Sequence, residues 1–226
     1  MARSLKIPLF AEVSDHYRQM IERSMIERIY HEDELILDYD DQSTDVLFIL
    51  SGKVRVLYRS PMGREVILAD LGADDFFGEL SAIDNAGRSA NVTALQRSEI
   101  ISLPRAQFME VATAVPAVAE QLLTTLVGRI RALDQRFSEM SVMKTNERLY
   151  AELLRLSQPR RGAAAERIIS PPPFHHHLAG RIGCRREVVS RELSQLMKEG
   201  IIVKTKGGLV LADVELLKER VAAALD

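Results

Sequence analysis

The sequence predicts an α+β fold in three parts: an N-terminal antiparallel β-roll or jelly roll, a long central helix, and a C-terminal winged helix-turn-helix. Three observations support it. Short β-rich segments separated by turns fill residues 35–68, an apolar helical stripe runs from residue 123 to 140, and two helix patterns followed by a strand hairpin occupy residues 175–211. We place the domain boundaries at residues 1–115, 116–144 and 145–226.

The first part contains four segments that are rich in β-branched, aliphatic and aromatic residues and too short for typical helices. They are Leu35–Leu37, Val46–Leu50, Val54–Tyr58 and Val66–Leu68. Ser51-Gly52 and Pro61-Met62-Gly63 supply turn-forming residues between them. Strands that are this short and closely spaced predict an antiparallel roll or barrel.

The central segment carries apolar residues at alternating spacings of three and four, at Leu123, Leu126, Ile130, Leu133, Phe137 and Met140. This spacing is typical of the a/d seam of a coiled coil, so the stripe predicts a homodimer held through the central helix. An amphipathic helix packed on its own domain would give a similar stripe, and that alternative stays open.

The last part begins with a segment rich in Pro and Gly, Gln158–Phe174, which we interpret as a connector. A short helix over His175–Ile182, a turn at Gly183 and a second helix over Arg185–Lys198 follow. Two strands, Ile201–Lys204 and Leu209–Leu211, are joined by a Gly-rich hairpin, and a helix over Val214–Leu225 ends the chain. This order predicts a winged helix-turn-helix.

The composition of the chain excludes several classes of protein. The chain has one cysteine, Cys184, which excludes an intrachain disulfide and a four-cysteine iron–sulfur cluster. We find no segment apolar enough to span a membrane and no signal-peptide pattern, so we expect a cytoplasmic protein. The net charge of −2 means that any binding to nucleic acid requires a local basic patch.

The segment from Phe76 to Ala90 combines groups suited to a small phosphorylated ribose. A glycine permits close approach of the backbone, a helix start offers free N–H groups, an arginine pairs with phosphate, a serine donates a hydroxyl, and a glutamate accepts from a sugar hydroxyl. These residues are Gly78, Glu79, Leu80, Ser81, Arg88 and Ser89. A tight turn with a surface arginine is the alternative.

The same residues resemble the phosphate-binding cassette of cyclic-nucleotide-binding domains, which runs Phe-Gly-Glu-Leu, a spacer, then Arg and a small residue before Ala. The likeness extends from about Phe10 to Leu211 and is close to the cyclic AMP receptor branch of the CRP/FNR transcription regulators. It implies cyclic AMP or cyclic GMP as the effector, and Leu37, Val56 and Leu68 as an apolar wall beside the nucleotide. Those three residues would otherwise simply be barrel core.

The sequence departs from that branch at the base-reading positions. A Thr-Ser pair that reads adenine in the branch aligns with Leu133 and Asp134. Leucine has no hydrogen-bonding side chain, whereas a carboxylate can accept from the two adjacent donors of guanine. We therefore hypothesise that cyclic GMP binds at least as well as cyclic AMP. The alternative is that Asp134 is a solvated residue paired with Arg131 or Arg136.

The second helix of the predicted helix-turn-helix has a polar face that suits base edges in a major groove, made of Arg186, Glu187, Ser190 and Arg191. Arg185, Lys198, Lys204 and Lys206 would hold phosphates. The pattern resembles the recognition helix of the family, which implies duplex DNA with inverted TGTGA-like half-sites. His175 is expected to contact a phosphate. His175-His176-His177 cannot share one ion, because successive helical residues diverge, so we expect no metal.

We expect allosteric coupling of the two sites through a hinge near Val142–Asn146. RNA polymerase is an expected partner, and the Gly162–Arg167 loop is a candidate for that contact by its position alone. One alternative is a regulator of the same fold that responds to another ligand, such as a cyclic dinucleotide, or that binds DNA constitutively. An enzyme is disfavoured, because no nucleophile–base pair or metal-ligand cluster accompanies the cassette.

Overall fold

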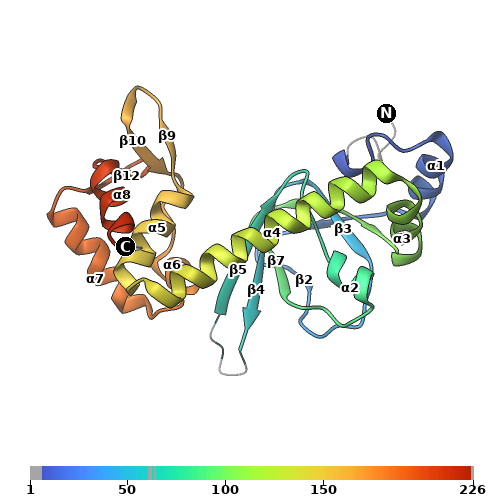
Figure 1. The fold of residues 1–226 in the computed structure, drawn as a ribbon, viewed down its shortest axis with the longest axis horizontal. Coiled ribbons are helices and arrows are strands. Elements are labelled where there is room, and N and C mark those ends of the chain that lie inside the picture. The colour runs from blue at the N-terminus through green and yellow to red at the C-terminus, as the bar shows by residue number, and fades with distance from the viewer. Residues whose placement is uncertain (1–6, 61–62, 64, 225–226) are drawn as a thin grey trace. The chain divides into compact units, whose positions relative to one another are not determined.

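The computed structural model describes residues 7–60, 63 and 65–224 (Figure 1). Its contacts divide the chain into two compact units, with the division after Ile130 inside the longest helix. Pro61 and Met62 of one predicted turn, and Leu225 of the last predicted helix, lie outside the described residues. The predicted α+β fold is confirmed, because antiparallel sheets, a long helix and a C-terminal helix-turn-helix follow in that order.

The first unit contains two four-stranded sheets whose neighbouring strands are antiparallel. One sheet has the order β1 (Ile26–Tyr30), β8 (Ser98–Leu103), β3 (Val46–Ser51), β6 (Phe76–Phe77), and the other has β2 (Leu35–Leu37), β7 (Asn91–Ala94), β4 (Lys53–Arg59), β5 (Glu65–Gly72). The four predicted strands correspond to β2–β5. Both sheets contribute to one apolar cluster inside the roll, formed by Leu37, Leu47, Ile49, Val54, Phe77, Val92 and Ile100.

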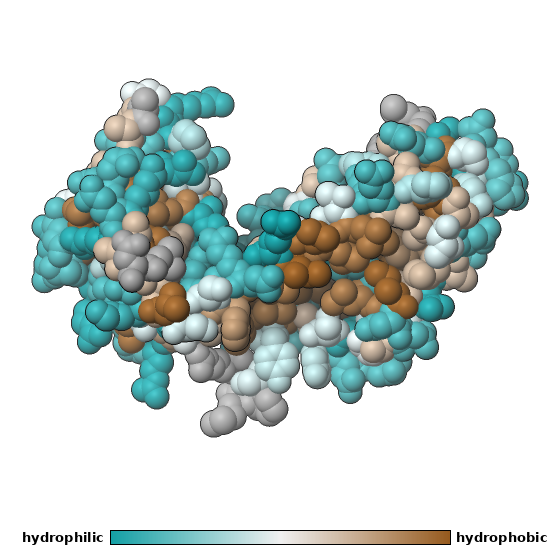
Figure 2. Space-filling view, viewed as in Figure 1, coloured by the Kyte–Doolittle hydropathy of each residue, from teal (hydrophilic) through white to brown (hydrophobic). Residues whose placement is uncertain are grey.

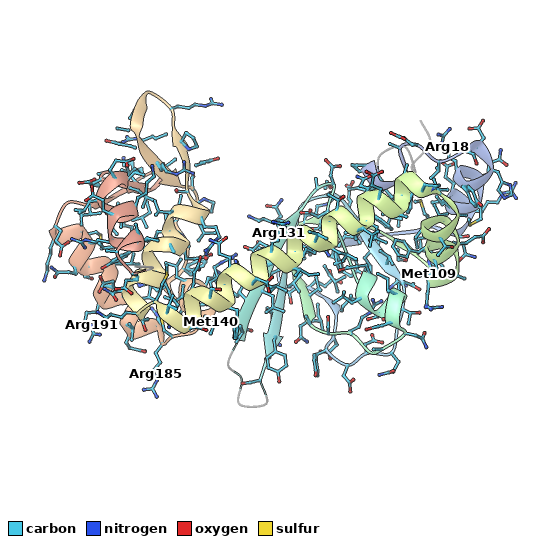
Figure 3. All side chains as sticks on the ribbon, viewed as in Figure 1. Arg18, Met109, Arg131, Met140, Arg185 and Arg191 are labelled. Carbon is cyan, nitrogen blue, oxygen red and sulfur yellow. The ribbon has the colours of Figure 1, made fainter. Side chains whose placement is uncertain are left out.

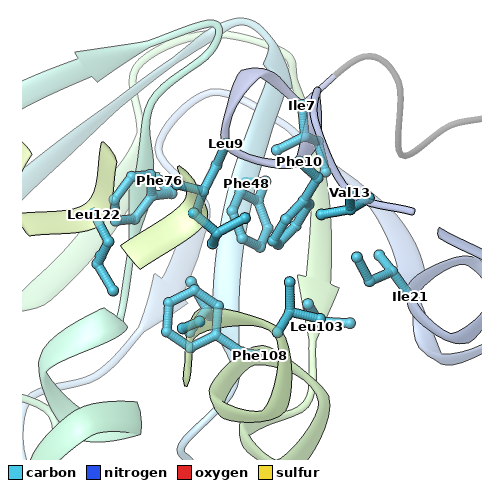
Figure 4. Close-up of a cluster of buried hydrophobic side chains, with 14 of the residues drawn as sticks. Ile7, Leu9, Phe10, Val13, Ile21, Phe48, Phe76, Leu103, Phe108 and Leu122 are labelled. Atoms are coloured by element: carbon cyan, nitrogen blue, oxygen red, sulfur yellow. The ribbon is translucent and has the colours of Figure 1, made fainter. Parts of the chain in front are cut away.

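The alternate side chains of β3 and β8 contribute to a second apolar cluster (Figure 4). It is covered by α1 (Asp15–Ser24), α3 (Arg105–Ala114) and the start of α4. Phe48 lies at its centre, with its ring centroid 5.1 Å from that of Phe10 and 6.5 Å from that of Phe108. The period of two along each strand therefore divides the apolar residues between the inside of the roll and this helical layer.

The helix α4 spans Pro116–Val142. Of the predicted stripe, Leu126 packs against the cluster of Figure 4, whereas the others are more than half exposed within one chain: Leu123, Ile130, Leu133, Phe137 and Met140. Figure 2 shows apolar surface along this helix. In the described residues no single helix meets the length and hydropathy needed to span a bilayer. The helices α3 and α4 would do so only together, and they are bent by 106°.

The second unit is a winged helix-turn-helix built from α5 (Thr145–Leu156), α6 (His175–Ile182), α7 (Arg186–Lys198) and α8 (Val214–Ala222). These helices pack on a four-stranded sheet of order β11 (Ile202–Thr205), β12 (Gly208–Leu211), β10 (Ala163–Ile169), β9 (Gln158–Arg160). Buried residues of all four helices share one core.

The prediction of a connector over Gln158–Phe174 is wrong for residues 158–169, which form the β9–β10 hairpin. Pro159 is tolerated because β9 is the edge strand of the sheet, where a missing N–H donor costs little. Ile168 and Ile169 of β10 pair with Val210 and Leu209 of β12. The strand was missed because its Ala-rich, charged start has no apolar alternation.

Charged side chains join the last turns of α4 to α5 and α6 within the second unit. Arg155 Nη2 of α5 lies 2.6 Å from Glu139 Oε1 of α4, and its other terminal nitrogen pairs with Glu152. Arg181 of α6 reaches the almost fully buried Glu152 at 3.4 Å. The helix is interrupted between α4 and α5 at Met143 and Lys144. This network of ion pairs therefore links the two helices across the interruption.

Candidate functional site

The polar loop of the first unit begins at Gly78, which has a left-handed backbone (φ +81°) and precedes α2 (Glu79–Asp84). A Cβ at this position would lie 2.6 Å from Arg88 Nη1 and 2.9 Å from the carbonyl oxygen of Asp45. Glycine is therefore required twice, by the backbone conformation and by the close approach of Arg88.

Arg88 is 3% exposed, and its guanidinium is held by uncharged acceptors. Nε donates to Ser43 Oγ at 3.0 Å, Nη1 to the Gly78 carbonyl at 3.0 Å, and Nη2 to the Asp45 carbonyl at 2.9 Å. Burial lowers the pKa of Arg88, because it removes water from the charged form. None of these three acceptors is a carboxylate, although the charges of Asp41, Asp45 and Glu79 act on the pKa of the guanidinium in the direction opposite to burial.

Glu79 is 4% exposed and forms an ion pair that the sequence did not predict. Arg129 Nη1 of α4 donates to Glu79 Oε1 at 2.7 Å, and Nη2 donates to the Phe76 carbonyl at 2.5 Å. The Arg129 guanidinium also lies 4.9 Å from the centroid of the Phe76 ring. The available signal was that Arg129 interrupts the most apolar part of this helix. The ion pair occupies one carboxylate oxygen of Glu79, the residue that was predicted to accept from a sugar hydroxyl.

The remaining residues of the loop take different positions. Ser81 is buried and its hydroxyl donates to the Gly87 carbonyl at 3.2 Å, so it stabilises the loop. Leu80 and Ser89 are exposed. The predicted apolar wall is buried at Leu37 and half-buried at Val56 and Leu68.

A cavity of about 230 Å³ lies beside Arg88 in the roll. Asp41, Ser43 and Asp45 line its polar side, and its apolar side includes Leu37, Leu47 and Ile100. The Arg88 guanidinium beside this apolar wall is a cation for a small amphipathic anion, whereas the carboxylates of Asp41 and Asp45 in the same cavity oppose an anion close to them. The predicted base-reading residues, Leu133 and Asp134, lie on α4 after Ile130, in the second unit, and both are exposed.

In the second unit, α7 presents a polar face whose charged side chains are exposed. Arg186, Glu187 and Arg191 are exposed on it, and Arg185 precedes its first residue. Figure 3 shows the Arg185 and Arg191 side chains extending away from the body of this unit. The opposite face is anchored by buried Val189, Leu193 and Leu196, with Val188 half-buried.

Two further cations and a histidine surround this face. Lys204 on β11 and Lys206 in the turn after it are exposed. His175 opens α6, and its Nδ1 lies 2.7 Å from Ser190 Oγ of α7. Burial, together with the charges of Arg186 and Lys204, lowers the pKa of His175. Among the described residues, no three His, Cys, Asp or Glu side chains gather as a metal ion would require.

Comparison with known proteins identifies the two domains in which these residues lie. Residues 27–114 match the cyclic nucleotide-binding domain, and residues 147–220 match the Crp-like helix-turn-helix domain. The chain is 31% identical to the cyclic AMP receptor protein of Thermus thermophilus over 195 residues. These aligned residues make up 85% of this chain and 86% of the relative. The chain belongs to the CRP/FNR family of transcription regulators.

A further relative and a solved structure are also similar to this chain. A CRP-like cAMP-activated global transcriptional regulator of Mycobacterium tuberculosis is 29% identical over 175 residues, covering 76% of this chain and 77% of the relative. The c-di-GMP responsive global regulator CLP of Xanthomonas campestris has a similar fold, with a TM-score of 0.71 and 19% identity over 88% of this chain and 99% of that one.

Membership of the CRP/FNR family confirms the family predicted from the cassette and the helix-turn-helix. It also means that the chain is a transcription regulator and not an enzyme, because that is what the members of the family are. The loop at Gly78–Ser89 lies inside the cyclic nucleotide-binding domain, and the polar face of α7 lies inside the Crp-like helix-turn-helix domain.

Proposed function

We propose that this regulator is a cytoplasmic homodimer that binds cyclic AMP or cyclic GMP at the Gly78–Ser89 loop and, when liganded, binds an inverted repeat of TGTGA-like half-sites. The observation that carries the proposal is the buried Arg88 guanidinium, held by uncharged acceptors beside a cavity with an apolar wall. The cAMP-activated relative and the cyclic AMP receptor protein named above support the same ligand class.

Each part of the chain has a role in this proposal. Residues 1–115 would bind the nucleotide, with Gly78, Arg88 and Ser89 at the phosphate and Glu79 at the ribose. Residues 116–144 would form the dimer seam. Residues 145–226 would bind DNA, with Arg186, Glu187, Ser190 and Arg191 at base edges and His175, Arg185 and Lys206 at phosphates.

The two sites would be coupled through the end of α4. The ligand acts by binding one conformation of the dimer more tightly than another. The helix is interrupted between α4 and α5 at Met143–Lys144. The geometry of this segment would set the position of the reading helix. Contact with RNA polymerase would follow through residues 162–167, which include the turn of the β9–β10 hairpin and most of β10.

The base preference rests on Asp134. We propose that its carboxylate accepts from the N1–H and 2-amino groups of guanine, so that cyclic GMP binds at least as tightly as cyclic AMP. The substitution Asp134→Ala should then weaken cyclic GMP more than cyclic AMP. If the ratio of the two affinities is unchanged, Asp134 has no part in base choice.

A second candidate effector is a cyclic dinucleotide. Leu133 and Asp134 stand where the resemblance places the adenine-reading pair, and the similar fold of the c-di-GMP responsive regulator CLP supports this candidate. The cassette itself favours a mononucleotide.

Calorimetric titration of the dimer with cyclic AMP, cyclic GMP and cyclic di-GMP tests the proposal. We expect micromolar binding of at least one mononucleotide, and a loss of roughly tenfold or more in Arg88→Gln, because a charge-assisted hydrogen bond contributes about 1.5–3 kcal/mol. A melting curve of the variant controls for folding. Binding of cyclic di-GMP alone would select the second candidate, and binding of none of the three would leave a DNA-binding regulator with a different signal.

A further inference from the structure

One hydrogen bond links the first residue of α6 to the predicted reading face of α7. His175 Nδ1 lies 2.7 Å from Ser190 Oγ, fifteen positions along the chain. Ser190 follows Arg186 by one helical turn and directly precedes Arg191, so its hydroxyl lies among the groups proposed to read bases.

What Ser190 can offer to DNA depends on the protonation state of His175 and, for neutral His175, on its tautomer; we assign the Nε2–H tautomer to the free protein. A neutral imidazole has one donor and one acceptor nitrogen, so if Nδ1 accepts from Ser190, the serine proton is spent inside the protein. An imidazolium has two donors. Its Nδ1–H then donates to Ser190 Oγ, which frees the serine proton for a base acceptor, while Nε2–H is available for a phosphate.

The environment favours the neutral form in the free protein. The imidazole is half-buried, and the charged groups that act on it are two cations, Arg186 from α7 and Lys204 from β11. Both cations and the burial lower the pKa of His175. A DNA phosphate beside the ring would act in the opposite direction, because an anion stabilises the imidazolium.

We propose that His175 and Ser190 act as one proton-dependent reading unit: DNA binding places a proton on His175, and that proton turns the Ser190 hydroxyl into a donor toward a base. The inference rests on the proposed DNA-binding role of α7. The direction of the pH dependence of DNA affinity follows from the linkage between proton binding and DNA binding. Because the complex binds the proton more tightly than the free protein, DNA affinity rises as pH falls through the pKa of the complex, and levels off below the pKa of the free protein.

Binding of the full-length, nucleotide-saturated dimer to a duplex with inverted TGTGA half-sites, measured between about pH 6 and pH 8, tests this unit. We expect the Kd of the wild type to rise with pH by roughly tenfold for each unit by which the His175 pKa differs between the two states. His175→Asn keeps a polar group near the Nδ1 position but cannot titrate, so its Kd should lose this dependence. His176→Asn, on the exposed neighbouring residue, should keep it.

Two further measurements test the His175–Ser190 pair directly. Calorimetry of the wild type in buffers of different ionisation enthalpy should detect proton uptake on binding, without any variant. Ser190→Ala should abolish the pH dependence of base preference on duplexes substituted within one half-site. A pH profile of His175→Asn like that of the wild type, or absence of proton uptake, would overturn the inference while DNA binding stands. If the wild type binds neither this duplex nor one of unrelated sequence, the proposed function is overturned as well.

Discussion

Arg88 and Gly78 depend on each other at the level of single atoms. The glycine carbonyl accepts from Arg88 Nη1, and the missing Cβ leaves the space in which that nitrogen lies. The arginine cannot keep this position beside a side chain at residue 78, so the proposed phosphate site is sensitive to a single methyl group.

We therefore predict that Gly78→Ala lowers nucleotide affinity by at least about tenfold. The left-handed backbone costs an alanine about 1–2 kcal/mol, and its Cβ would displace Arg88. Calorimetry with the tighter nucleotide is the measurement. Gly72→Ala is the matched control, because a Cβ there meets no atom within 4 Å and the backbone is not left-handed. Equal affinities of both variants would show that Arg88 is not the phosphate ligand.

Arg186 offers a residue-scale test of DNA reading. Its side chain is exposed on α7, and arginine suits the O6 and N7 atoms of guanine. We predict that Arg186→Ala costs about 1–3 kcal/mol on duplexes with the preferred guanine and relaxes discrimination at that base pair. Fluorescence anisotropy with base-substituted half-sites checks this. Uniform weakening on every sequence would instead identify Arg186 as a phosphate contact.

At the scale of elements, α4 is divided between two kinds of contact. Leu122 and Leu126 pack on the core of the first unit, whereas Ile130, Leu133 and Phe137 stay exposed. The alternative of a helix packed on its own domain therefore accounts for Leu122 and Leu126 and leaves the rest of the stripe uncovered. An exposed apolar stripe at coiled-coil spacing fits the homodimer seam proposed above.

We predict that Ile130→Asp weakens the dimer by at least about tenfold, because a carboxylate in an apolar seam loses its hydration without gaining a partner. Ala132→Asp, which lies on the other side of the same helix and is also exposed, should leave the dimer intact. Analytical ultracentrifugation over a concentration series distinguishes them. A dimer of unchanged stability in Ile130→Asp would exclude this stripe as the seam.

At the scale of the whole molecule, the charges are distributed unevenly. The net charge is −2, yet Arg185, Arg186, Arg191, Lys204 and Lys206 are exposed on or beside the α7 face. A protein without a general positive field has to obtain its affinity for DNA from this local patch and from counterions released at the phosphates that it neutralises.

DNA affinity should therefore fall steeply with salt. We predict that Lys206→Gln lowers the slope of log Kobs against log salt by about one for each half-site and weakens all sequences alike. Lys53→Gln, exposed in the first unit, is the control and should leave the slope unchanged. A slope that does not change in Lys206→Gln would remove the wing from the phosphate contacts.

The strands β2–β5, the stripe on α4 and the boundaries of α6 were predictable, because each has a local cause: period-two alternation, spacing of three and four, or a glycine turn. The β9–β10 hairpin was not, since β10 is identified by its pairing with β12, which comes forty residues later. Arg129 was missed for the same reason, because its partner Glu79 lies fifty positions away.

The sequence by itself determined the fold class, the family and the residue types of both proposed sites, because these depend on patterns between near neighbours. Only the tertiary structure decided which of those groups are already engaged: Glu79 by Arg129, Arg88 by the Ser43 and Asp45 loop, and Ser190 by His175. The physical reason is that buried polar groups must find partners, and the fold brings those partners from distant parts of the chain.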